Sequence, residues 1–306
     1  MRRTSSIDML RPEGVLGHLL LRGAGRDLYT APDGSTAVIG EAGAALEVAF
    51  LDGRKVTAVT AAPDVPGLDG LVGVPAASGF RRRVGELAPG EVAAGSLLHL
   101  LLDDVPGAAL VSGYAVGAAG AGDPVGRAGY RQVADLCAGF RVGGTIMAEV
   151  AVGRRPPVVT GPCAPSLDRP DDPLTWHDLD PLPPHGMRRR RRLDVAGGEV
   201  ITVNSFFRDS HVSAEGLETV IHEYEVHATV RPDSWVVLEA VATARVLPWL
   251  ECPAAVGSAG RLAGRSLVDV RDAVREEFRG ISTCTHLNDQ LRSLGDVMTL
   301  ARALER

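Results

Sequence analysis

The sequence has very little lysine and cysteine, and it lacks any long uncharged apolar run. Lys55 is the only lysine, whereas arginine, alanine and glycine are abundant; we attribute this bias to a GC-rich genome and not to phosphate recognition. The formal net charge of -6 gives no reason to expect nucleic acid as a partner. Since no run of about 18 uncharged apolar residues occurs, we expect no membrane span. The first residues, MRRTSSIDML, have no apolar segment after the arginines, which disfavours a secretion signal.

The few cysteines also limit the class of protein. The chain has four in 306 residues, at 137, 163, 252 and 284. Such wide spacing in a long chain is typical of reduced thiols, so we expect a cytoplasmic protein. A phosphate-binding loop, a G-x-G-x-x-G turn and an H-E-x-x-H helix are all missing from the sequence. Their absence disfavours a nucleotide cofactor and zincin-type chemistry.

The chain resembles itself at an offset of 178 residues. VPAASG at 74–79 matches CPAAVG at 252–257, so that Pro75 aligns with Pro253. The same offset holds without a gap for about 35 residues, and both segments read as strand, turn, strand and a helix that begins at the proline. We therefore predict two α+β copies, each an antiparallel meander with helices on one face, over residues 1–152 and 187–306. A proline-rich linker, 153–186, is expected to be ordered around Trp176, without regular structure.

The second copy has the clearer pattern. Residues 188–196, 199–210, 218–230 and 235–247 are rich in β-formers or alternate between apolar and polar side chains, which predicts four antiparallel strands. The basic run Arg188–Arg192 is interpreted as a strand with exposed arginines. Three helices are expected to follow: one near Pro253, one over 266–280, and one from Cys284 onward with a leucine stripe.

Polar residues at apolar positions are the candidate site. His222 shares the apolar face of its strand with Tyr224, and Cys284 lies on the buried stripe at a helix start, where free N–H groups favour a thiolate. His286 follows two residues later, and Cys252 lies between two prolines at a strand end. Two imidazoles and two thiols form a plausible ligand set for Zn²⁺ or Fe²⁺. Independent core residues remain the alternative interpretation.

Other polar residues give weaker signals. Glu223 and Glu251 are candidate general bases, because each neighbours a member of the proposed ligand set. Arg208, Asp209 and His211 stand near a strand end, where charged residues are common, so a structural interpretation is favoured and their roles stay open. No role can be assigned to His177 from its sequence context.

These motifs resemble a known family. HEYEVHATV, LPWLECPAA and TCTHLNDQLRSL are similar to a bacterial family described only as domain of unknown function 2889, over residues 187–306. The resemblance points to His222, Glu223, Cys252, Cys284 and His286, although Thr283 stands where the family often has glycine. The family name implies no reaction. The first copy has Ala44, Val74 and Leu97 near the positions of His222, Cys252 and Cys284, so we expect it to be degenerate.

Two functions fit this pattern. The first is an enzyme, hydrolase- or lyase-like, that acts on a small organic molecule in a cleft between the copies. It would use either a metal held by His222, Cys252, Cys284 and His286, or Cys284 as a nucleophile with a histidine partner. The second is a non-catalytic protein, with a structural His/Cys cluster, that binds a small ligand or serves as an accessory protein to an enzyme. A homo-oligomer is compatible with both.

Overall fold

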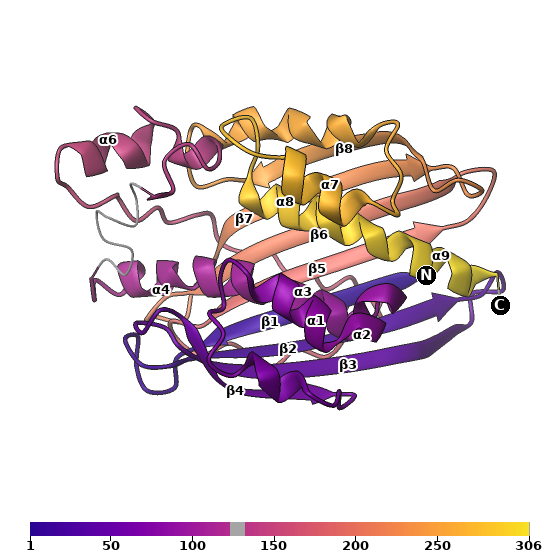
Figure 1. Ribbon diagram of the computed structural model, residues 1–306, viewed down its shortest axis with the longest axis horizontal. Helices are drawn as coiled ribbons and strands as arrows, with labels where there is room; N and C mark the ends of the chain where they lie inside the picture. Colours follow the sequence, from indigo (N-terminus) through magenta and orange to yellow (C-terminus); the bar gives the residue numbers. More distant parts are fainter. Residues whose placement is uncertain (123–131, 306) are drawn as a thin grey trace.

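The computed structural model describes residues 1–122 and 132–305, and it is built on one continuous antiparallel sheet of eight strands (Figure 1). The strand order is β4-β3-β2-β1-β5-β6-β7-β8. The α+β class with antiparallel strands is therefore confirmed. The sequence did not predict that the two meanders join: β1 pairs with β5 from Arg2↔Asp194 to Met9↔Met187.

Each half of the molecule consists of a meander followed by helices. In the first half the strands are β1 (Arg2–Leu10), β2 (Leu19–Thr30), β3 (Thr36–Ala49) and β4 (Lys55–Ala62). They are followed by η1 (Leu68–Leu71), α1 (Phe80–Leu87), α2 (Pro89–Ala94), α3 (Leu97–Val111) and α4 (Gly113–Ala118). Two short helices, η2 (Ala138–Phe140) and α6 (Thr145–Ala151), precede the linker.

The second half repeats this order. Its strands are β5 (Met187–Ala196), β6 (Ile201–Val212), β7 (Glu218–Val230) and β8 (Val237–Val246), close to the four predicted ranges. Its helices are η3 (Cys252–Leu262), α7 (Val270–Glu277), α8 (Thr285–Ser293), η4 (Leu294–Asp296) and α9 (Val297–Leu304). The prolines do not behave alike: Pro253 starts η3, whereas Pro75 forms an isolated bridge with Lys55 and α1 begins only at Phe80. The predicted helix start at Pro75 is therefore wrong.

The helices of both halves lie on the same face of the sheet (Figure 1). Tyr224 and Val226 of β7 are buried beneath them and share one core with Leu287 and Leu291 of α8. This arrangement confirms the leucine stripe and the predicted apolar face of β7 from His222 onward. Val220, which was expected on the same face, pairs with Ser210 beyond a bulge and lies on the opposite face. Burying such side chains is the main source of stability, at roughly 1.5–3 kcal/mol for each one. No helix among the described residues is long and apolar enough to cross a membrane.

The linker, hereafter the strap (residues 153–186), crosses the opposite face of the sheet. It contains only isolated bridges, and Trp176 within it is 7% exposed, as predicted. The Trp176 ring meets Phe206 edge to face at 5.9 Å. His177 of the strap lies between Thr4 and Ser6 of β1, 3.0 and 2.9 Å from their hydroxyls. The strap therefore covers the outer face near the junction of the halves.

The arginine run forms the centre of the sheet and is not exposed. Arg188, Arg189 and Arg191 of β5 are each no more than 4% exposed, so the expectation of solvated arginines is wrong. The run lies in the middle of an eight-stranded sheet, because β1 covers one edge of β5 and β6 the other. Alternation then directs Arg189 and Arg191 toward the helices, and the other three toward the strap.

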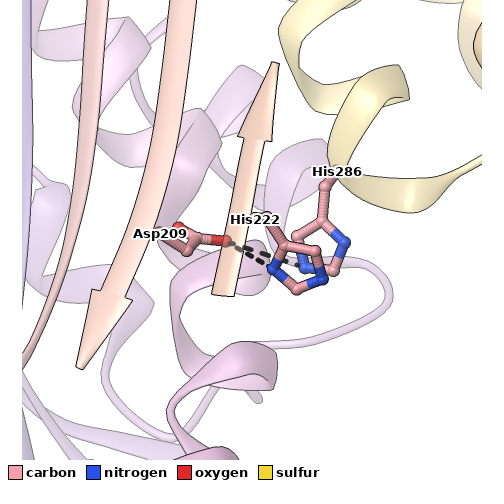
Figure 2. Close-up of side chains that lie close together, drawn as sticks. All are labelled: Asp209, His222 and His286. Carbon is pink, nitrogen blue, oxygen red and sulfur yellow. Dashed lines mark ion pairs between the residues drawn. The ribbon is translucent and has the colours of Figure 1, made fainter. Parts of the chain in front are cut away.

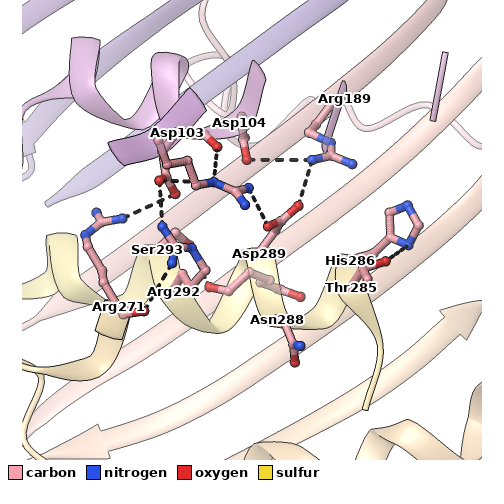
Figure 3. A network of polar contacts seen from close by, with 12 residues as sticks. Asp103, Asp104, Arg189, Arg271, Thr285, His286, Asn288, Asp289, Arg292 and Ser293 are labelled. Atoms are coloured by element: carbon pink, nitrogen blue, oxygen red, sulfur yellow. Dashed lines mark hydrogen bonds and ion pairs between the residues drawn. The ribbon is translucent and has the colours of Figure 1, made fainter. Parts of the chain in front are cut away.

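Buried arginines require buried carboxylates, and α3 and α8 supply them (Figure 3). Arg191 forms a bidentate pair with Asp104 of α3, at 2.5 and 2.6 Å. Arg292 of α8 donates to Asp103 at 2.6 Å, and Arg81 donates to Asp289 at 2.7 Å. This network joins the helical layers of the two halves.

Candidate functional site

Three polar side chains meet beneath the first turn of α8. Asp209 of β6 and His222 of β7 are directly opposite each other in the antiparallel pair, so their side chains lie on the same face of the sheet. His286, the second residue of α8, stacks on His222 with ring centroids 3.7 Å apart. Asp209 and His222 are buried, and His286 retains a small exposed edge. Figure 2 shows the stacked imidazoles, each joined by a dashed line to the same Asp209 oxygen.

The distances within this cluster are short. Asp209 Oδ2 lies 3.4 Å from His222 Nδ1 and 3.8 Å from His286 Nε2. One ligand-type atom from each of the three residues lies within 4.8 Å of the others. His222 Nδ1 makes no hydrogen bond of normal geometry within the described residues, so its attraction to Asp209 is mainly electrostatic. Among the described residues this is the only group of three or more potential ligands that is this compact.

Arg189 holds the carboxylate of Asp209. Its guanidinium donates to both oxygens, from Nε to Oδ1 at 2.9 Å and from Nη2 to Oδ2 at 3.1 Å. Burial alone would raise the pKa of Asp209, but the charge of Arg189 and the contact with His222 hold that pKa well below its usual range. Asp209 is therefore an anion at neutral pH.

His286 is a neutral imidazole at neutral pH. Burial, reinforced by the neighbouring His222, lowers the pKa of His286 well below its ordinary value. The Nε2 atom of its ring lies 3.8 Å from Asp209 Oδ2, and Nδ1 lies 3.9 Å from the Cys284 sulfur. The cluster thus combines an ionised carboxylate with at least one neutral imidazole.

Cys284 is the N-cap residue of α8, so the helix begins at Thr285, one residue later than predicted. Its thiol is 5% exposed. Burial raises the pKa of the thiol to about 11, although the His286 and Leu287 backbone N–H groups act in the opposite direction. The expected thiolate is therefore not favoured: desolvation outweighs the helix start.

Cys252 lies beside the cluster but not in its compact core. It is 6% exposed in the first turn of η3, and burial with the nearby Cys284 raises the pKa of its thiol to about 12. A methyl group added at Gly139 would stand only 3.2 Å from its sulfur. Cys137, which the sequence did not single out, is also buried, and its thiol contacts the Thr285 backbone N–H. Three buried thiols thus surround the start of α8.

Neither of the two glutamates proposed as general bases faces the cluster. Glu223 forms an ion pair with Arg208, and alternation places both on the strap face, opposite to Asp209 and His222. Glu251 accepts hydrogen bonds from the Thr145 backbone N–H at 2.7 Å and from its hydroxyl at 2.9 Å. It therefore caps α6, and within residues 1–122 and 132–305 neither carboxylate has a hydrogen bond or ion pair with a member of the cluster.

Asp209 and Arg189 are the site residues that sequence reasoning missed. Asp209 has the same parity in its strand as the apolar Phe207, and this was the available signal that its side chain faces inward. Its pairing with His222 depends on a β-bulge between Asp209 and Ser210. Beyond the bulge, Ser210 pairs with Val220. If that register continued without the bulge, Ile221 and not His222 would stand opposite Asp209.

Comparisons with known proteins give a family match over part of the chain and no activity. No curated protein and no solved structure matches the chain. Residues 187–300 match the family described as Protein of unknown function (DUF2889), the stretch that contains β5–β8, Asp209, His222 and His286.

Proposed function

We propose that Asp209, His222 and His286 bind one divalent transition metal, Zn²⁺ or Fe²⁺, and that the protein is a metal-dependent enzyme acting on a small organic molecule by hydrolysis or elimination. The observation that carries this proposal is the compact cluster of one carboxylate and two imidazoles from three different elements. Two histidines and one carboxylate form a common metal-binding set that leaves coordination positions open.

The donor chemistry fits such an ion. Metal–ligand bonds of about 2.0–2.2 Å need ligand atoms roughly 3–3.5 Å apart, and the observed separations from Asp209 Oδ2 are 3.4 and 3.8 Å. The depressed pKa of Asp209 and of His286 means that neither must lose a proton at neutral pH. A cation would also satisfy His222 Nδ1, which has no hydrogen bond within the described residues.

Residues around the cluster would orient the ligands. Arg189 fixes both oxygens of Asp209, and the carboxylates of Asp104 and Asp289 lie 3.7 and 3.4 Å from Arg189 and offset its charge. The Cys284 sulfur lies on the outer side of His286, near Nδ1, where a contact fixes the tautomer of a ligating imidazole. We therefore assign Cys284 to positioning, and replace the expected thiol ligands with Asp209. The bound ion would polarise a carbonyl group or lower the pKa of water.

A metal-free reaction is the second candidate. Cys284, His286 and Asp209 follow one another as sulfur, imidazole and carboxylate, separated by 3.9 and 3.8 Å, which is the order of a nucleophile, a base and an orienting group. The raised pKa of the buried thiol counts against it. A non-catalytic ligand-binding protein with a structural metal remains the other alternative.

Metal content separates these candidates. We expect untagged protein to contain close to one equivalent of zinc or iron, measured by elemental analysis, and Asp209→Asn, His222→Ala and His286→Ala to lose most of it. His227→Ala is the matched control, because His227 lies on β7 but is exposed, and among the described residues its ring hydrogen-bonds only with Asn204. Protein that stays metal-free after reconstitution would reject the proposal, and reactivity lost only in Cys284→Ser would favour the thiol. Metal retained without turnover of any ester, amide or hydroxy-acid probe would favour the structural metal.

We also infer that the halves arose by duplication, and that the first has lost its site. One row of paired residues crosses the sheet: Ala44–Gly23–Ile7–Arg189–Asp209–His222. A two-fold axis between β1 and β5 would exchange the two halves of this row. It would match Ile7 with Arg189, Gly23 with Asp209 and Ala44 with His222. Ala44 and His222 are also separated by 178 positions, the offset found in the sequence. Leu101 of α3 lies over Gly23, 3.3 Å from the place that a methyl group on this glycine would occupy. A leucine therefore covers the position where the second half has its polar cluster.

A further inference from the structure

A cavity of about 550 Å³ lies between the strap and the outer face of the sheet. Its apolar wall includes Trp176 and Leu179 of the strap and Val212 of β6, and its polar wall includes Arg188 and Arg190 of β5. The volume is in the range of cavities that bind small organic molecules. The metal-binding cluster proposed above lies on the other side of the same strands, so this cavity is a separate site.

Arg190 is the unusual member of the arginine run. The other four arginines each have a carboxylate oxygen within 3.0 Å: Asp8 for Arg188, Asp209 for Arg189, Asp104 for Arg191 and Asp194 for Arg192. The buried Nε of Arg190 makes no hydrogen bond in the described part of the chain, and the nearest carboxylate, Glu218, is 3.8 Å from the guanidinium. Glu218 itself accepts a hydrogen bond from the Ser210 hydroxyl at 2.5 Å.

This lack of a close partner is costly for Arg190, because its side chain is only 14% exposed. Burial lowers its pKa, which means that the surrounding protein does not fully compensate the buried charge. A guanidinium in this state favours a planar oxyanion that can accept two parallel N–H bonds.

The strap contributes a second donor without a partner. Trp176 is 7% exposed, and its indole Nε1 is buried with no acceptor within the described residues. Five carboxylates also line the cavity, and two of them have arginine partners: Asp172 pairs with Arg2 at 2.6 Å and Asp180 pairs with Arg22 at 3.2 Å. Arg190 Nε and Trp176 Nε1 are thus the donors of the cavity wall that lack an acceptor among the described residues.

We propose that this cavity binds a small organic carboxylate with an apolar body. The carboxylate pairs with Arg190, and the apolar body packs against Trp176, Leu179 and Val212. An uncharged molecule of the same shape cannot replace the anion at Arg190, and an inorganic anion cannot use the apolar wall. These two requirements make the proposal testable without knowledge of the natural ligand.

The experiment compares benzoate, hexanoate, benzamide and inorganic phosphate by calorimetry on the full chain. We expect benzoate or hexanoate to bind, and benzamide and phosphate to bind at least about tenfold more weakly, because a charge-assisted bidentate pair is lost or the apolar contact is missing. Arg190→Gln should weaken carboxylate binding by a similar factor. Arg192→Gln is the matched control on the same strand and face, because Arg192 pairs with Asp194 at 3.0 Å and does not line the cavity.

A second variant keeps the test decisive if Arg190→Gln does not fold. Glu218→Gln removes the nearest negative charge while it preserves an acceptor for Ser210, so carboxylate affinity should rise. The proposal is overturned if neither carboxylate binds at millimolar concentration, if benzamide binds as well as benzoate, or if phosphate binds as tightly as both carboxylates. It is equally overturned if Arg192→Gln weakens binding as much as Arg190→Gln, or if Glu218→Gln lowers the affinity.

Discussion

Replacing Arg189 with methionine should strongly destabilise the protein, because it removes the partner of a fully buried carboxylate. Arg189 lies near three acidic residues, but two of them have other cations: Asp104 pairs with Arg191 at 2.5 Å, and Asp289 pairs with Arg81 at 2.7 Å. Asp209 has no other arginine or lysine partner among the described residues. Breaking one buried pair in this way costs roughly 3–5 kcal/mol.

The control for this variant is Arg192→Met. Arg192 lies on the same strand and pairs with Asp194 at 3.0 Å, but its side chain is 21% exposed. Asp194 keeps Arg2 at 2.6 Å, so no carboxylate is left without a cation. We expect a loss below about 1 kcal/mol, which is typical of a pair that solvent can screen. Urea denaturation followed by circular dichroism measures both changes in the free energy of unfolding.

The pH dependence tests the electrostatic origin of the effect. In the wild type the pKa of Asp209 is lowered on folding, so the stability it contributes is present above the unfolded pKa and is lost as pH falls through the folded pKa. Without Arg189, burial becomes the dominant influence and raises the pKa of Asp209 in the folded variant above its unfolded value. Protonation of Asp209 at lower pH then removes the unpaired charge and restores part of the lost stability. The difference between the two proteins should therefore shrink as pH falls from 7 toward about 4, the unfolded pKa of aspartate. Arg189 also lies over the Phe207 ring, 4.9 Å from its centroid. A difference that stays constant over this range would refute the reasoning and point to the loss of that packing.

Two further predictions rest on burial and close packing. Cys163 is exposed while the other three cysteines are buried, so a thiol reagent at pH 8 should modify one thiol rapidly in native protein and four after unfolding; rapid modification of Cys284 would contradict its raised pKa. Gly25→Ala should destabilise the protein by about 1–3 kcal/mol through overpacking, because the added methyl would stand 2.8 Å from the Thr4 carbonyl oxygen and from a Leu97 methyl. Gly257→Ala, where nothing lies within 4 Å, should leave the urea midpoint nearly unchanged, and equal effects would disprove the packing argument.

The local elements of the second half were determined by the sequence alone. Alternation in residues 222–230 specified which side chains of β7 face the core, and the leucine period after Cys284 specified the buried face of α8. These patterns are readable because side-chain direction within one strand or helix follows from backbone geometry. The same two patterns predicted that His222 and Cys284 are buried, and the structure confirms both predictions.

The composition of the cluster was decided only by tertiary structure. Asp209 meets His222 because a bulge sets the register of two strands, and the sequence carries no strong local mark of that bulge. Arg188–Arg192 would be solvated on an edge strand, but the pairing of β5 with β1 buries them and gives Arg189 its role beside Asp209. Pairing between segments distant in the chain depends on the packing of the whole sheet and on the supply of carboxylates from α3 and α8, and neither can be derived from the period of a single strand.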